Sequence, residues 1–95
     1  MNRKLVLTST FKKSYQKFVK QHPELQKSLE NTLLQMQQDV FDRSLATHKL
    51  SGKLLGLRAA SCGYDCRIIF TIEKNELSNT EVIVLLNIGT HDVVY

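Results

Sequence analysis

The chain has 95 residues, of which 42% are hydrophobic and 23% charged, which is ordinary for one soluble globular domain over residues 1–95. Apolar runs stay far below the roughly 20 residues that cross a bilayer, and the apolar part of Met1–Leu7 is too short for a signal peptide. We therefore expect a cytoplasmic protein with no membrane partner. The net charge of +4 divides into +7 over residues 1–58 and −3 over residues 59–95, which suits a nucleic acid or an acidic protein partner, or merely a solvated lysine face.

The first part of the chain predicts a strand and two helices. Residues 3–8 read as a short strand, and Thr8, Ser9 or Thr10 can cap the helix that follows. His22-Pro23 ends this helix, because proline cannot continue it but can begin the next one. Apolar residues recur at helical spacing on both sides of this break: Phe11, Tyr15, Phe18 and Val19 before it, and Leu25, Leu29, Leu33 and Met36 after it, to about residue 38.

The remainder predicts a loop and three strands. Residues 39–54 are irregular and polar, and loops of this kind often carry functional sites. Strands are expected over 55–61, 64–73 and 81–88, with turns at 62–63 and 75–80; the last strand is continuously apolar and should be the most buried. The order strand, helix, helix, three strands predicts an α+β fold, in which a mainly antiparallel sheet carries the helical hairpin on one face.

Cys62 and Cys66 are the only cysteines, and no second pair of ligands accompanies them to complete a zinc site. In a reducing compartment we expect them to be free thiols, buried or half-buried. A magnesium site would need clustered carboxylates, which the sequence also lacks, so we expect no cofactor.

Five further side chains suggest acid–base chemistry on phosphate. Asp65 and Arg67 share one face of the predicted strand 64–73, although such a pair can also be a surface ion pair. His48 lies in the predicted loop, where most histidines are only surface residues. His91 and Tyr95 are four apart, which puts them on one face of a helical turn or a strand; His91 could equally be a cap or a stacking residue.

Several motifs together resemble the RelE/ParE superfamily of toxin–antitoxin toxins, and its YafQ-like mRNA interferases in particular. The matching segments are His48-Lys49-Leu50-Ser51-Gly52, Gly52-Lys53-Leu54-Leu55-Gly56-Leu57-Arg58, Asp65-Cys66-Arg67-Ile68-Ile69-Phe70, and Gly89-Thr90-His91 followed by the aromatic Tyr95. One departure is Ser61, which stands where some YafQ-like members carry a further catalytic histidine.

The resemblance implies a ribosome-dependent endoribonuclease that cleaves mRNA without a metal. His48, Asp65, Arg67, His91 and Tyr95 would form the site, with Lys49, Lys53 and Arg58 binding RNA. A free histidine has a pKa of about 6.5 and can act as acid or base, so His91 would be the acid, and His48 or Asp65 the base. Arg67 would stabilise the phosphorane, and Tyr95 would stack on a base.

The partners implied are mRNA, the ribosome and a cognate antitoxin in a hetero-oligomeric complex. Two other functions share the fold: a ParE-like toxin that inhibits DNA gyrase by binding, and an inactive RelE-fold binding module. ParE-like chains typically lack the two-histidine set, so His48 and His91 favour the nuclease.

Overall fold

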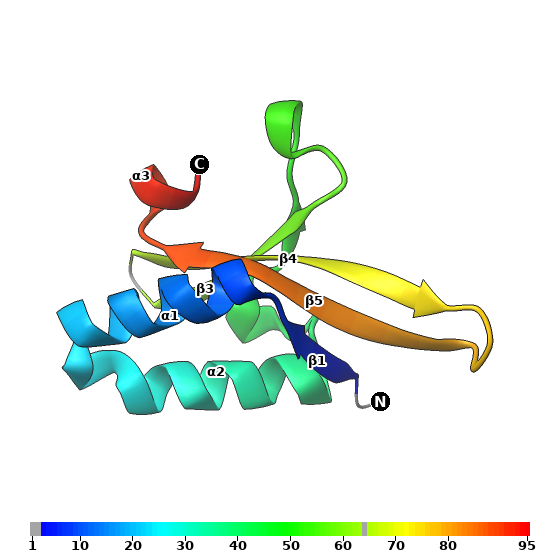
Figure 1. Ribbon diagram of the computed structural model, residues 1–95, viewed down its shortest axis with the longest axis horizontal. Coiled ribbons are helices and arrows are strands. Elements are labelled where there is room, and N and C mark those ends of the chain that lie inside the picture. Colours follow the sequence, from blue (N-terminus) through cyan, green and yellow to red (C-terminus); the bar gives the residue numbers. More distant parts are fainter. Residues whose placement is uncertain (1–2, 64) are drawn as a thin grey trace.

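A computed structural model describes residues 3–63 and 65–95 of the protein (Figure 1). Its five strands form one mixed sheet in the order β1-β5-β4-β3-β2, where β1 runs parallel to β5 and every other neighbouring pair is antiparallel. The chain follows the order β1 (Lys4–Leu7), α1 (Ser9–Gln21), η1 (Pro23–Leu25), α2 (Gln26–Gln38), η2 (Arg43–Leu45), β2 (His48–Lys49), η3 (Gly52–Leu54), β3 (Arg58–Gly63), β4 (Cys66–Asn75), β5 (Thr80–Gly89) and α3 (His91–Val94), where η marks a short 3₁₀ helix.

The helical hairpin forms where the sequence predicts it. The hydroxyl oxygen of Thr8 accepts a hydrogen bond from the backbone N–H of Phe11 at 3.1 Å and so caps α1. The helix ends at Gln21, before the His22-Pro23 break, and proline then starts the 3₁₀ turn that leads into α2. The α+β prediction, with two helices packed on one face of a mainly antiparallel sheet, is confirmed.

The main core lies between these helices and the sheet. Phe11 and Leu29 are completely buried in one cluster with residues of β4 and β5, such as Phe70 and Ile83. Strand β5 lies between β1 and β4, but it is not more buried than β4, because its first residues are exposed and several others are only half-buried. The opposite face of the sheet is covered by a second and much smaller apolar cluster, described below.

The predicted strand 55–61 is wrong at its start, since β3 begins only at Arg58. Gly52 and Gly56 have φ angles of +66° and +93°, a region that favours glycine, and they fold residues 50–57 into a loop. The N–H of Leu50 donates to the carbonyl of Leu57 at 3.0 Å and closes this loop. Leu55, whose apolar character suggested a strand, is 78% exposed.

Other differences concern short elements. The region 39–54, expected to be irregular, contains η2 and the short edge strand β2. The expected turn at 62–63 is the end of β3, which continues through a bulge to Gly63. Tyr64, the predicted start of the next strand, lies outside the described residues, and β4 is described from Cys66. The C-terminal residues, for which the sequence left a helical turn or a strand open, form the one-turn helix α3.

The expectation of free thiols is also wrong, because Cys62 and Cys66 form a disulfide. The bulge between Ser61 and Gly63 changes the pairing register, and the two cysteine Cα atoms lie 5.0 Å apart across the β3–β4 connection. Both cysteines are buried in the main core. The disulfide therefore closes the turn that carries Asp65.

Candidate active site on the open face of the sheet

Helix α3 brings His91 and Tyr95 together. Their rings meet edge to face, with centroids 4.5 Å apart. The His91 side chain is 61% exposed, and its Nδ1 lies 3.7 Å from a carboxylate oxygen of Asp92. This confirms that the two residues share one face of a helical turn, and it presents an imidazole and a phenol to solvent side by side.

Two attachments hold α3 against the sheet. At its start, a carboxylate oxygen of Asp65 accepts a hydrogen bond from the backbone N–H of His91 at 3.1 Å. At its end, Val94 is buried in a cluster with Ala59 of β3 and Ile69 of β4. Leu50 and Leu57, at the two ends of the glycine-rich loop, pack against the same cluster. The small cluster thus joins α3 to the segment that follows His48.

His48 belongs to this same face. It pairs with Ala59 in the antiparallel β2–β3 ladder, and directly opposed residues direct their side chains to one side of a sheet. Its Nδ1 lies 3.0 Å from the carbonyl oxygen of Ala46. A carbonyl can only accept, so Nδ1 carries the proton in this bond, and in the neutral ring Nε2 keeps the lone pair. With Nδ1 engaged in this way, Nε2 is the nitrogen of His48 that can act as a general base.

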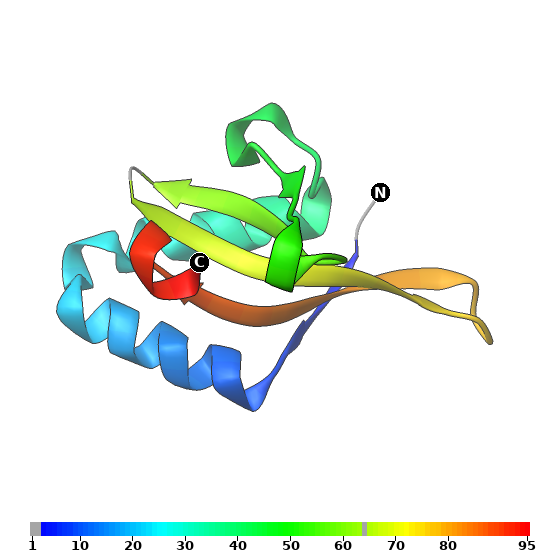
Figure 2. The same cartoon turned by 90° about the horizontal axis from the view of Figure 1, so that it is seen from above.

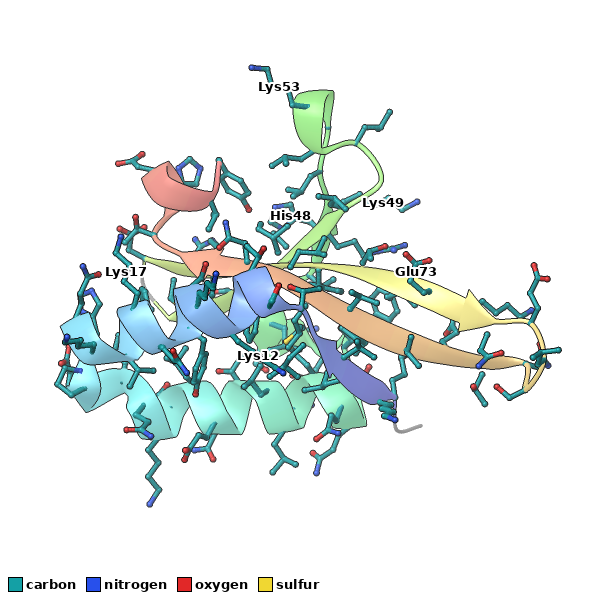
Figure 3. The ribbon with its side chains drawn as sticks, viewed as in Figure 1. Lys12, Lys17, His48, Lys49, Lys53 and Glu73 are labelled. Atoms are coloured by element: carbon teal, nitrogen blue, oxygen red, sulfur yellow. A yellow bond between two sulfur atoms is a disulfide. The ribbon has the colours of Figure 1, made fainter. Side chains whose placement is uncertain are left out.

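Figures 1 and 2 show α3 and the loop 50–57 over the same side of the sheet, with α1 and α2 on the other. In Figure 3, His48 lies at the base of the raised loop. Ile69 and the small cluster occupy the sheet surface between the loop and α3. The structure thus places both histidines and Tyr95 around one apolar patch on the face away from the helical hairpin.

Arg67 lies beside this group and is engaged with the β3–β4 turn. It alternates with Ile68 and so shares the face of Ile69, opposite Gly89 of β5. One guanidinium nitrogen donates to the carbonyl oxygens of Cys66 at 2.8 Å and Gly63 at 3.2 Å. The same nitrogen lies 3.5 Å from the hydroxyl of Ser61. Ser61, the position at which the sequence departs from the YafQ-like motif, thus adjoins Arg67.

The three predicted RNA-binding residues are divided between the two sides of the sheet. Lys49 and Arg58 are paired across β2 and β3 and alternate with His48 and Ala59, so they belong to the other face. The Arg58 guanidinium lies 5.9 Å from the ring centroid of Phe41, beyond the end of α2. Lys53 is exposed at the tip of the raised loop (Figure 3). Side-chain alternation thus separates Lys49 and Arg58 from the candidate site.

The sequence analysis missed one polar residue of this face, Asn87. Asn87 pairs with Ile69 and is half-buried, beside a bulge in the β4–β5 ladder. The signal was present in the sequence, because Asn87 is the single polar side chain within the apolar run Val82–Ile88. We add Asn87 to the residues that can contact a ligand on this face.

Hydrogen bonds also order the segment that leads to His48. The side-chain hydroxyl of Ser44 and then its backbone N–H, at 3.0 Å, donate to the Asp42 carboxylate and lower its pKa below the usual value. The hydroxyl of Thr47 donates to the carbonyl of Val40 at 2.6 Å. Ala46, which accepts from His48, has a φ of +48°. The position of His48 therefore depends on a locally bonded turn rather than on a long strand.

Neither a metal site nor a membrane helix is found in the described part of the chain. Within residues 3–63 and 65–95, His, Cys, Asp and Glu side chains do not gather in threes as metal ligands would. None of the helices described is long and apolar enough to cross a membrane. The absence of a cofactor remains a prediction.

Comparisons with solved structures define the class of the fold. YafQ from E. coli strain BL21(DE3) superposes with a TM-score of 0.77 at 15% identity, covering 98% of each chain. A chain of the E. coli DinJ-YafQ toxin-antitoxin complex gives 0.75 at 15% identity, covering 100% of this chain and 99% of that one. A chain of the RelBE2 complex from Mycobacterium tuberculosis gives 0.72 at 15% identity, covering 96% and 100%. The fold is that of the RelE-like toxins.

Residues 3–95 match the family described as "Bacterial toxin of type II toxin-antitoxin system, YafQ", and the chain belongs to this family. A search of curated proteins gave no match. The family confirms the toxin class inferred from the motifs, and with it a cognate antitoxin as the partner. Toxins of this family are generally endoribonucleases.

Proposed function

We propose that this toxin is a ribosome-dependent endoribonuclease that cleaves mRNA by metal-free acid–base catalysis and so inhibits translation. The observation that carries the proposal is the fastening of α3. Asp65 and the Val94 cluster hold His91 and Tyr95 on the face that also carries His48, whose Nε2 can accept a proton.

In the proposed reaction, His48 Nε2 removes the proton from the 2′-hydroxyl of the nucleotide before the cleaved bond. The 2′-oxygen attacks the adjacent phosphorus, and the bond to the 5′-oxygen breaks as His91 donates a proton to that oxygen. The products are a 2′,3′-cyclic phosphate and a 5′-hydroxyl. Asp65 was the alternative base; one of its two carboxylate oxygens accepts from the His91 backbone, and we assign it to holding α3.

Arg67 and Tyr95 would assist this reaction without exchanging protons. Arg67 already directs one nitrogen to backbone carbonyls, and its planar guanidinium can stabilise negative charge on the phosphorane. The Tyr95 ring, half-exposed beside His91, can stack on a base of single-stranded RNA. Both groups lie beside a patch of the sheet that offers apolar contact to nucleobases.

A cleavage assay on ribosomes with a defined mRNA tests the proposal. After the cut is mapped, the same mRNA is made with one 2′-deoxynucleotide before the cut, which removes the attacking hydroxyl. We expect cleavage of the all-ribose mRNA, cyclic-phosphate ends and no cleavage of the deoxy version. Ends with a 3′-hydroxyl, or cutting of the deoxy mRNA, would contradict it.

Growth measurements separate the nuclease from the other two functions. Expression of the toxin should arrest growth and translation, and co-expression of the antitoxin should restore both. A ParE-like toxin would instead block supercoiling by gyrase and leave mRNA intact, while an inactive binding module would leave growth unchanged.

A further inference from the structure

We infer that Asp65 is a positioning residue that holds α3 in place through its carboxylate oxygen and takes no part in proton transfer. The inference rests on the proposed function, because its importance for cleavage follows from the residues that α3 carries. The hydrogen bond between Asp65 and the His91 backbone does not depend on nuclease activity, so the capping role can be tested separately from the proposed function.

Helix α3 cannot be stable without outside contacts. It is a single turn of four residues, with hydrogen bonds from Val94 N–H to the Thr90 carbonyl and from Tyr95 N–H to the His91 carbonyl, both at 3.1 Å. Isolated helices shorter than about 12 residues are marginal in water. The first N–H groups of a helix also need acceptors from outside, and here Asp65 supplies one from 26 residues away.

The turn that carries Asp65 is fastened on both sides. The Cys62–Cys66 disulfide closes it, and the Arg67 guanidinium bonds to the carbonyls of Gly63 and Cys66. A carboxylate on a fastened turn loses little freedom when it accepts a hydrogen bond, so it can fix the start of α3 effectively. The geometry is that of a helix cap supplied by another part of the chain.

His48 makes Asp65 unnecessary as a base. Its Nδ1 donates to the Ala46 carbonyl, which leaves Nε2 to accept the proton of the 2′-hydroxyl. The Asp65 oxygen, in contrast, is directed at a backbone N–H of α3. The two groups thus have separate tasks: His48 exchanges a proton, and Asp65 holds the helix that carries the acid.

Two substitutions distinguish a cap from a base. Asp65→Asn keeps a carbonyl oxygen that can accept from the His91 N–H but cannot act as a base, and asparagine caps helices about as well as aspartate. Asp65→Ala removes the acceptor. Loss of a side-chain cap shifts a helix equilibrium by about 2- to 30-fold. Glu76→Ala, in the exposed β4–β5 turn, is the control for the loss of one negative charge.

The measurements are amide hydrogen exchange at Val94 and Tyr95 and cleavage on ribosomes. For Asp65→Ala we expect exchange about 5- to 10-fold faster and a similar loss of kcat/KM; Asp65→Asn and Glu76→Ala should stay within about 3-fold of the wild type in both. A loss of about 100-fold or more in Asp65→Asn with unchanged exchange would overturn the inference, as would unchanged exchange in Asp65→Ala. If the wild type cleaves nothing, the proposed function fails while the exchange data still decide the capping role.

Discussion

His91→Ala should separate activity from stability. The side chain is largely exposed, and its ring contacts Tyr95 edge to face. Such aromatic pairs contribute about 0.5–1.5 kcal/mol, and an exposed pair should lie near the lower limit. The backbone N–H that bonds to Asp65 remains in alanine. The free energy of unfolding should therefore fall by only about 0.5 kcal/mol.

The expected loss of activity is much larger. A positioned acid or base typically contributes about 10²–10⁴-fold, which corresponds to about 3–5 kcal/mol of the activation free energy. Cleavage of ribosome-bound mRNA measures this loss, and urea unfolding of the same sample measures stability. Antitoxin binding should also be retained, because α3 keeps both of its attachments.

His22→Ala is the matched control. Its ring also contacts an aromatic residue, Phe18, at a centroid distance of 4.8 Å, but it follows α1 in the helical layer. We expect a similar small loss of stability and full activity. Cleavage by folded His91→Ala within about 10-fold of the wild type would refute the role of His91 as the acid.

Three further predictions concern the supports of the site. Val94→Ala should lower the free energy of opening α3 by about 1–2 kcal/mol in hydrogen exchange, because the side chain is only 9% exposed; an unchanged value would show that the small cluster does not hold α3. Reduction of the Cys62–Cys66 disulfide, which joins residues four apart, should lower the free energy of unfolding in urea by about 2 kcal/mol, with a Cys62→Ser, Cys66→Ser double variant as the insensitive control. Arg67→Lys should cleave mRNA at a rate between those of the wild type and Arg67→Ala, since lysine keeps the charge but lacks the planar fork; equal rates for all three would remove Arg67 from the mechanism.

Local signals explain what the sequence predicted well. The Thr8 cap, the helical spacing of Phe11 and Phe18 and the proline after His22 all act within a few residues, so α1 and its end could be predicted. The same holds for β5, whose apolar run predicted a strand over 81–88 and forms one over Thr80–Gly89.

Features that depend on distant contacts could not be predicted. Leu55 reads as the start of a strand, but the left-handed Gly52 and Gly56 turn the chain into a loop there. Helix α3 is too short to show periodicity and depends on Asp65, far away in the sequence. The disulfide depends on the register of β3 and β4, in which Ser61 lies opposite Arg67 and the two cysteines follow at the end of the ladder.

The candidate site shows the same division. Both histidines were predicted from their motifs, yet the proton on His48 Nδ1 follows from a turn bonded to Ala46. Asp65 was predicted as a member of the site, but its hydrogen bond to α3 needed the folded chain. The residue types thus predicted acid–base chemistry, whereas the role of each side chain follows from the contacts that it makes in the folded chain.

The distribution of charge bears on the proposed dependence on the ribosome. The first 22 residues contain six basic residues and no acidic one, and Lys12 and Lys17 are exposed on α1 (Figure 3). His48 and His91 lie on the other side of the sheet, with Arg67 nearby. Electrostatic attraction to phosphate is independent of nucleotide sequence, so we expect the basic side chains of α1 to attract RNA as well. RNA bound at α1 would not reach His48 and His91, and the proposed role of the ribosome would be to orient mRNA toward the open face instead.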